Sequence, residues 1–183
     1  GWKKTGNTDL LRKQGKKLGF TVDVVQAVKI ADKNVSSSSI RKLITEGQVG
    51  EAAKLLGRDY EISGRVIHGR SRGHDLGFPT ANLSLLQHEK IVPGQGIFAI
   101  LVCWQNRWRP AAAYVGKSPT FSEGAFSIEV HMIDFSGDLY GEVIRVRFVE
   151  RLRSDQKFRN TAELSRQITR DCEKAKVILG YVT

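Results

Sequence analysis

The sequence has few cysteines and no long apolar run. Its two cysteines, Cys103 and Cys172, lie far apart and lack the spacing of metal ligands, which is typical of reduced thiols in a cytoplasmic protein. The longest apolar run, from Ile97 to Trp104, has the length of a strand and is too short to span a bilayer. The first residues also lack the pattern of a secretory signal. We therefore expect a cytoplasmic protein with no membrane partner.

The two commonest glycine-rich nucleotide motifs are also absent. The segment from Gly69 to Asn82 is rich in glycine, but no Gly-Lys-Ser/Thr follows it as in a P-loop. Its glycine spacing and its setting differ from those of the dinucleotide-binding fingerprint. The chain has no internal repeat either. A phosphate site in this chain would therefore belong to another class.

The composition is that of a globular protein with a basic excess. The 183 residues are 40% hydrophobic and 26% charged, which fits one ordinary domain with an appendage or two very small domains. The net charge is +10, of which residues 1–60 carry +6 and residues 61–183 carry +4. This excess favours phosphate-bearing partners but does not choose between a nucleotide and a nucleic acid.

Residues 1–57 predict a small α/β segment. Thr8 suits the N-cap of a helix over Asp9–Leu18, and the alternating, valine-rich stretch Phe20–Val28 predicts a strand. Four serines at 36–39 precede a helix that ends near Gly47, and another short helix follows. The segment has few apolar residues with which to form a core of its own. We also expect that the chain can self-associate through this segment.

From residue 60 onward the pattern is mainly β. In the fourth candidate strand, Ile128 and Val130 share one face while Glu129 and His131 share the other. The turn at 136–138 predicts a hairpin to the fifth strand, and one long amphipathic helix follows. The pattern predicts a small antiparallel β-barrel with a C-terminal helix. The expected elements are strands over Tyr60–His68, Gly96–Trp104, Trp108–Val115, Phe126–Phe135 and Glu142–Glu150, and a helix over Thr161–Leu179.

The glycine-rich, basic loop before Asn82 is the first candidate site. Such a loop exposes backbone N–H groups to an anion, and Thr80 and Asn82 supply oxygen atoms of the kind that Mg²⁺ accepts. The alternative is a long hairpin connection whose glycines serve turns. Glu129 is either a solvated carboxylate or a general base for a hydroxyl that attacks a phosphoryl group. His131 either contacts a nucleotide phosphate or simply lies beside Glu129.

Two further basic stretches have two interpretations each. Arg151-Leu152-Arg153 and Lys157-Phe158-Arg159 form either a solvated basic surface before a helix or a site for a phosphorylated product, with Phe158 beside an aromatic ring. The serines at 36–39, with Arg41 nearby, are helix N-caps or a phosphate site at a helix N-terminus.

Taken in order, these pieces resemble the riboflavin kinase family over residues 58–183, and residues 1–57 resemble the tail of the adenylyltransferase module of bifunctional bacterial riboflavin kinase/FAD synthetases. Each motif is weak alone, whereas the ordered set is specific. The motifs are Gly77-Phe78-Pro79-Thr80-Ala81-Asn82, Val115-Gly116-Lys117-Ser118-Pro119-Thr120, Glu129-Val130-His131, Asp138-Leu139-Tyr140-Gly141 and Arg151-Leu152-Arg153 with Lys157-Phe158.

The resemblance implies a six-stranded antiparallel Greek-key barrel that uses Mg²⁺ and ATP to phosphorylate riboflavin, giving FMN and ADP. It implies Glu129 as the catalytic base and Thr80 and Asn82 as Mg²⁺ contacts. The implied ATP contacts are Gly69, Gly73, Gly77, Thr80, Asn82, His131 and Tyr140, and the implied flavin contacts are Arg151, Arg153 and Phe158.

This chain departs from the family pattern at two positions, because bacterial relatives commonly have Asn where it has Tyr114 and Ser118. The nucleotide-binding His-x-x-His motif of the adenylyltransferase module is also absent, so FAD synthesis by this chain alone is not expected. Two alternatives stay open. One is a flavin-binding or regulatory fragment without turnover, and the other is a basic barrel that binds single-stranded nucleic acid through residues 104–109.

Overall fold

A computed structural model describes residues 7–30, 33–68, 77–87, 89–117 and 126–181. Three residues singled out in the sequence, Gly69, Gly73 and Ser118, lie outside these ranges. The chain divides into two compact units, Gly1–Val35 and Ser36–Thr183. The assignment of residues 1–57 and 58–183 to separate modules stays a prediction, although the second unit already includes the helices between residues 36 and 57.

The first unit contains one helix and a two-residue strand pair. Helix α1 (Thr8–Leu18) begins after Asn7, whose side chain accepts a hydrogen bond from the backbone N–H of Leu10 at 2.8 Å. The N-cap is therefore Asn7, and the predicted cap at Thr8 is wrong by one residue. Strands β1 (Lys29–Ile30) and β2 (Lys33–Asn34) pair antiparallel.

The predicted strand over Phe20–Val28 is wrong. In the structure these nine residues have no regular secondary structure, and only the two residues of β1 pair with a neighbour. A valine-rich alternation predicts a strand only where a partner strand can accept its backbone hydrogen bonds. Among the described residues of this unit, β2 supplies such a partner for β1 alone.

Two short helices begin the second unit and pack on its barrel. In α2 (Ser37–Thr45), Ser36 and Ser39 form a capping box, which confirms the N-cap interpretation of the serine run. Helix α3 (Val49–Leu56) follows, and its buried residues join the barrel core together with Ile44 of α2. These helices therefore fold with the barrel that follows them in sequence.

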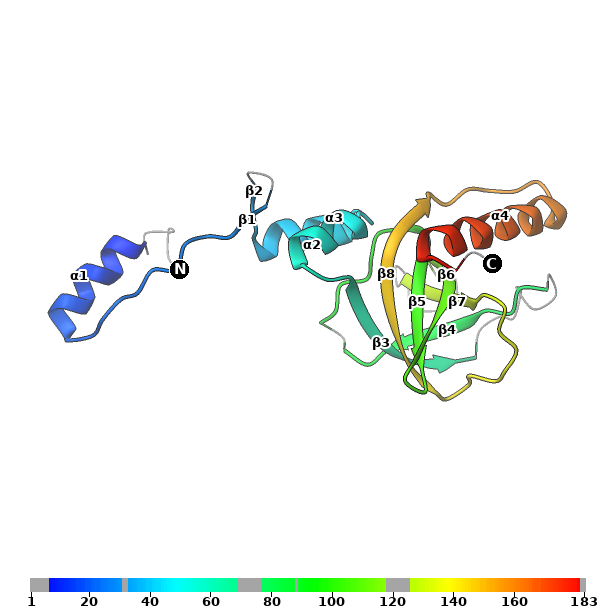
Figure 1. Ribbon diagram of the computed structural model, residues 1–183, viewed down its shortest axis with the longest axis horizontal. Helices are drawn as coiled ribbons and strands as arrows, with labels where there is room; N and C mark the ends of the chain where they lie inside the picture. The colour runs from blue at the N-terminus through cyan, green and yellow to red at the C-terminus, as the bar shows by residue number, and fades with distance from the viewer. Residues whose placement is uncertain (1–6, 31–32, 69–76, 88, 118–125, 182–183) are drawn as a thin grey trace. The chain divides into compact units, whose positions relative to one another are not determined.

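The barrel consists of six antiparallel strands in the closed order β3-β4-β7-β6-β5-β8 (Figure 1). Strands β5, β6 and β7 follow one another as neighbours and β8 returns beside β5, which is the Greek-key order that the resemblance implies. The strand missing from the pattern-based prediction is β4, which lies at the end of the glycine-rich loop. The strands are β3 (Tyr60–Ile67), β4 (Ala81–Leu85), β5 (Gly96–Trp104), β6 (Arg107–Lys117), β7 (Phe126–Met132) and β8 (Val143–Arg153).

The predicted hairpin between the fourth and fifth candidate strands is wrong. Strand β7 pairs with β4 and β6, whereas β8 pairs with β3 and β5. Residues 133–142 instead cross between the two strands, and they bury Leu139 in the core while the backbone of Gly141 and Glu142 bonds to Val66. A turn of glycine and aspartate marks a reversal of the chain, but it does not say which strands then pair.

Helix α4 (Thr161–Leu179) lies along the outside of β5 and β6 (Figure 1). The predicted amphipathic character is confirmed, since Cys172 and Ala175 are buried and Ile168 and Leu179 pack with them against Ala99 and other wall residues. The helix thus covers one side of the barrel with a second, smaller core. The space between this helix and the wall contains the candidate site.

Candidate functional site

Five residues that are far apart in sequence form one row across the outer wall of the barrel. The strand register pairs Asn82 on β4 with Glu129 on β7, Glu129 with Tyr114 on β6, Tyr114 with Ile97 on β5, and Ile97 with Arg153 on β8. Directly opposed residues of antiparallel strands share a face, with Cβ atoms about 5 Å apart. The fold therefore places the predicted base next to a predicted Mg²⁺ contact.

A cavity of about 370 Å³ lies over four residues of this row, from Glu129 to Arg153, between the wall and α4. We call it the flank cavity. Its apolar lining includes Ile97, Phe158 and Ile168, and its polar lining includes Glu129 and Asp155. Its volume falls within the range of small-molecule sites, and a mainly apolar wall with a few convergent polar groups is typical of them.

A second hollow of about 220 Å³ lies at the end of the barrel, beside the 133–142 crossover. We call it the mouth cavity. Its lining includes Val66, Met132 and residues 135–140, and thus Tyr140, whose ring stacks on His68 with the centroids 3.9 Å apart. Thr80 lines both cavities. Two adjacent cavities that share a hydroxyl-bearing residue suit a reaction between two bound substrates.

His131 fixes the segment that carries Thr80. Its ring nitrogen Nδ1 lies 2.9 Å from the carbonyl oxygen of Pro79, so that the N–H at this atom donates to the carbonyl. The ring of Phe78 meets His131 edge-on at 5.5 Å, and Gly77 has the positive φ of 80° that favours glycine. His131 lies in the flank cavity beside Glu129 and holds the backbone that leads into β4.

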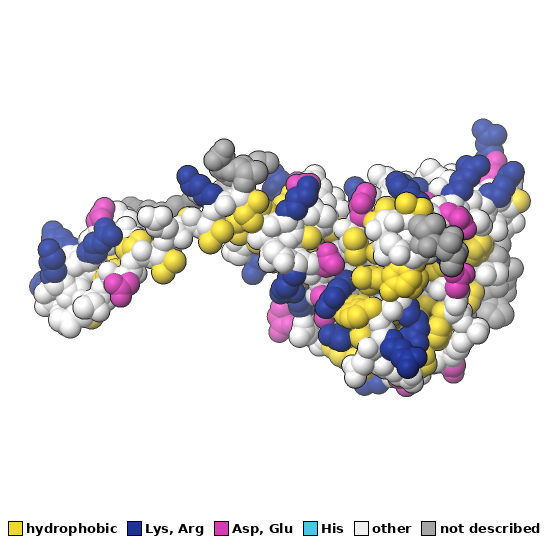
Figure 2. All heavy atoms as spheres, viewed as in Figure 1, with side chains coloured by type: hydrophobic (Ala, Val, Ile, Leu, Met, Phe, Trp, Pro, Cys, Tyr) yellow, Lys and Arg dark blue, Asp and Glu magenta, His cyan; other side chains and the backbone are white. Residues whose placement is uncertain are grey.

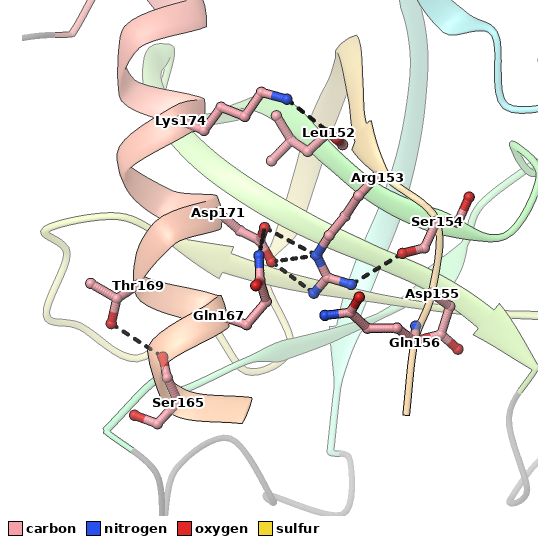
Figure 3. A network of polar contacts seen from close by, with 10 residues as sticks. All are labelled: Leu152, Arg153, Ser154, Asp155, Gln156, Ser165, Gln167, Thr169, Asp171 and Lys174. Atoms are coloured by element: carbon pink, nitrogen blue, oxygen red, sulfur yellow. Dashed lines mark hydrogen bonds and ion pairs between the residues drawn. The ribbon is translucent and has the colours of Figure 1, made fainter. Parts of the chain in front are cut away.

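Arg153 belongs to a buried polar network (Figure 3). Its Nε and Nη2 donate to the carboxylate of Asp171 on α4 at 2.8–3.1 Å, and Nη1 donates to the carbonyl of Ser154. Gln167 also donates to Asp171, and the side chains of Arg153 and Asp171 are only 18% and 8% exposed. The alternative of a solvated basic stretch is therefore wrong for Arg153.

Arg151 does not line the flank cavity. Its Nη2 donates to the backbone carbonyl of Gln95, and its side chain packs beside Gly47 and Gly96, where an added Cβ on Gly96 would lie 2.7 Å from Nε. Of the three predicted flavin contacts, the structure brings Arg153 and Phe158 together, with the guanidinium 5.7 Å above the phenyl ring, and places Arg151 outside this cavity.

The donor set near Glu129 fits Mg²⁺. Within the described ranges, no group of three or more His, Cys, Asp or Glu side chains is arranged to hold a metal. Thr80 and Asn82 instead offer a hydroxyl and an amide oxygen beside the carboxylate of Glu129. Mg²⁺ prefers such hard oxygens and is commonly held by few protein ligands together with water and substrate phosphates.

Sequence reasoning missed three titratable residues of the flank cavity, Tyr114, Asp155 and Asp171, as site residues. Asp171 had a usable signal, because it stands three residues after Ile168 on the otherwise apolar face of a helix. Tyr114 stood out only as a departure from the family pattern. Asp155 follows a basic stretch and carried no signal of its own.

The aromatic and basic residues at 104–109 form internal contacts. The guanidinium of Arg147 lies 3.9 Å from the ring centre of Trp108, and Arg109 lies 5.6 Å from that of Trp104. The rings are thus stacked by the protein's own arginines, which disfavours base stacking. On the face in Figure 2, Lys and Arg side chains are interspersed with acidic and apolar ones. This arrangement disfavours the nucleic-acid alternative.

Comparisons with known proteins agree on one family. A family model described as riboflavin kinase matches residues 56–179. The bifunctional riboflavin kinase/FMN adenylyltransferase of Haemophilus influenzae is 36% identical over 98% of this chain and 58% of that protein. The protein of the same description from Bacillus subtilis is 39% identical over 87% of this chain and 50% of that protein. The chain therefore spans little more than half the length of the curated relatives that it matches.

The fold is also found among solved structures. A crystal structure described as a macrolide-efflux protein from Streptococcus pneumoniae has a TM-score of 0.82 and 35% identity, over 90% of this chain and 54% of that chain. Within the part of our chain that the structure describes, no helix has the length and apolarity needed to cross a membrane.

Proposed function

Because the chain belongs to the riboflavin kinase family, whose model matches residues 56–179, we propose that it transfers the γ-phosphate of ATP to the 5′-hydroxyl of riboflavin, giving FMN and ADP. The observation that carries this proposal is the pairing of Glu129 with Asn82 beside Thr80, the residue that lines both cavities. The proposed base and the proposed Mg²⁺ contacts then lie next to two cavities, one for each substrate.

We assign the flavin to the flank cavity and the nucleotide to the mouth cavity. The apolar side chains of Ile97, Phe158 and Ile168 suit an isoalloxazine ring, and Glu129 in the same lining suits the ribityl end. Tyr140 and the backbone near Thr80 suit the nucleotide and its phosphates. Gly77 and Thr80 then border the transferred phosphate, as the resemblance implies.

The chemistry needs a base and a place for negative charge. Glu129 accepts the proton of the ribityl hydroxyl as its oxygen attacks the γ-phosphorus, while the bond to the β-phosphate oxygen breaks and ADP leaves. Thr80 and Asn82 would hold Mg²⁺, which when bound would neutralise the negative charge on the transferring phosphoryl group. His131 contributes by holding the Pro79 carbonyl, and hence Thr80, in place.

The direct test is incubation with riboflavin, ATP and Mg²⁺, followed by chromatography. We expect FMN and ADP in equal amounts and no FAD, because the chain lacks the His-x-x-His motif. Binding of riboflavin without formation of FMN would support the alternative of a fragment without turnover. Formation of FAD would contradict our expectation that this chain catalyses only the phosphorylation of riboflavin.

Asn82→Ala should weaken the binding of Mg·ATP by about tenfold, which corresponds to about 1.4 kcal/mol, because one oxygen contact to the metal is lost. Isothermal titration calorimetry measures this affinity. Ser84→Ala, two residues along β4 and exposed, is the matched control and should bind as the wild type does. ATP titrated with EDTA present should show no difference between Asn82→Ala and the wild type. Equal Mg·ATP affinities for the two proteins would refute the metal contact.

Two broader expectations remain proposals. Both cysteines are buried as free thiols, which supports a location in the reducing cytoplasm. The first unit exposes Leu11, Leu18 and Val25, which supports self-association through this segment.

A further inference from the structure

The outer wall of the flank cavity is an irregular segment, residues 154–160, between β8 and α4. It has no regular secondary structure, yet three of its side chains, Asp155, Gln156 and Phe158, line the cavity. A segment of this kind stays in place only if specific contacts hold it.

Asp155 makes those contacts to two separate parts of the barrel. Its Oδ2 accepts a hydrogen bond from the hydroxyl of Tyr114 at 3.2 Å and another from Nε2 of Gln95 at 2.9 Å. Its Oδ1 accepts from the backbone N–H of Gln156 at 2.8 Å. Tyr114 lies in the C-terminal half of β6 and Gln95 immediately before β5, so the carboxylate joins the segment to the wall at two points. Hydrogen bonds to a charged group are stronger than those between two neutral groups.

Tyr114 can reach Asp155 because its ring lies along the strand over Gly116. A Cβ atom at Gly116 would lie 2.0 Å from the hydroxyl oxygen of Tyr114, so any larger residue there would displace the ring. Burial, together with the negative charges of Asp155 and Glu129, raises the pKa of Tyr114 to about 12. The phenol therefore stays protonated at neutral pH and acts as the donor in this bond.

We propose that Tyr114 and Gln95 act as a clasp on Asp155 that holds residues 154–160 over the flank cavity and thereby slows the release of the flavin bound beneath. The identity of that ligand rests on the proposed function, whereas the clasp itself does not. Tyr114 acts as a positioning residue: it keeps Phe158 and Gln156 at the cavity wall. One donor is on β6 and the other immediately precedes β5, and both bond to the same carboxylate, so the loss of either loosens the same segment.

Tyr114→Phe tests the clasp, because it removes one hydroxyl and keeps the ring. In stopped-flow measurements of flavin fluorescence, we expect FMN to dissociate about tenfold faster than from the wild type, as befits the loss of one hydrogen bond to a carboxylate. Gln95→Leu removes the other donor from a different element and should change the rate in the same direction. Tyr181→Phe, whose hydroxyl bonds to the carbonyl of Trp108 outside both cavities, is the matched control.

A second measurement needs no flavin. Quench-flow hydrogen exchange on the ligand-free chain should show faster exchange across residues 154–160 in Tyr114→Phe and in Gln95→Leu than in the wild type or Tyr181→Phe. Unchanged exchange in both variants would overturn the clasp, and so would FMN dissociation rates within twofold of the wild type. If the wild-type chain neither binds FMN nor makes it, the proposed function fails, and the exchange result still decides on the clasp.

Discussion

Replacing Glu129 by glutamine should lower the rate of phosphoryl transfer about a thousandfold while leaving nucleotide binding in place. General bases contribute between about a hundredfold and ten-thousandfold, and an amide of the same shape cannot accept the proton of the attacking hydroxyl. Glu129 stands next to Asn82 in the strand register and lines the flank cavity, so its loss removes the predicted base without emptying the site. Rapid-quench single-turnover assays with riboflavin and Mg·ATP measure this rate directly.

The control is Glu150→Gln, which makes the same chemical change at an exposed position of β8 outside both cavities. Glu150→Gln should turn over at the wild-type rate. Calorimetry should give Glu129→Gln an affinity for Mg·ATP close to that of the wild type. A turnover rate of Glu129→Gln within tenfold of the wild type would show that another group accepts the proton.

The strands that were predictable from sequence are those in which apolar residues facing the barrel interior alternate with polar residues facing outward. Strand β7 alternates because its inward residues Ile128 and Val130 fill the barrel, and this alternation alone placed Glu129 on the outer face. Strand β4 was missed because it is short and follows a glycine-rich loop, so local composition there favours a turn. Its existence depends on pairing with β3 and β7, which a local pattern cannot report.

The same limit applies to the site. Sequence reasoning could select Glu129 by its face and Thr80 and Asn82 by their chemistry, but only strand register places Asn82 opposite Glu129. The flavin role of Arg153 rests on the resemblance and stays a prediction, although Arg153 lines the flank cavity. Its partner Asp171 lies 18 residues further on in α4, and this tertiary contact uses much of the guanidinium. Long-range pairs of this kind follow from how α4 packs on the barrel.

The packing of α4 on the barrel leads to the second prediction with a large effect, a loss of stability. Asp171→Ala should lower the free energy of unfolding by about 3 kcal/mol, because it leaves the largely buried Arg153 guanidinium without its carboxylate. Gln167 loses the same acceptor. Urea denaturation followed by circular dichroism measures the change. Asp171→Asn keeps one acceptor oxygen and should lose less stability than Asp171→Ala.

The matched control is Glu46→Ala, which removes an exposed carboxylate that lies 3.9 Å from Lys42 at the end of α2. Exposed pairs of this kind contribute little, so its unfolding curve should overlay that of the wild type. The double variant Arg153→Met/Asp171→Leu removes both charges together and should recover much of the stability lost in Asp171→Ala, because no unpaired charge is left behind. If Asp171→Ala and Glu46→Ala unfold alike, the Arg153–Asp171 pair does not hold α4 to the barrel. If only Asp171→Ala is destabilised, the pair secures the helix that closes the flank cavity, and flavin affinity should fall with it.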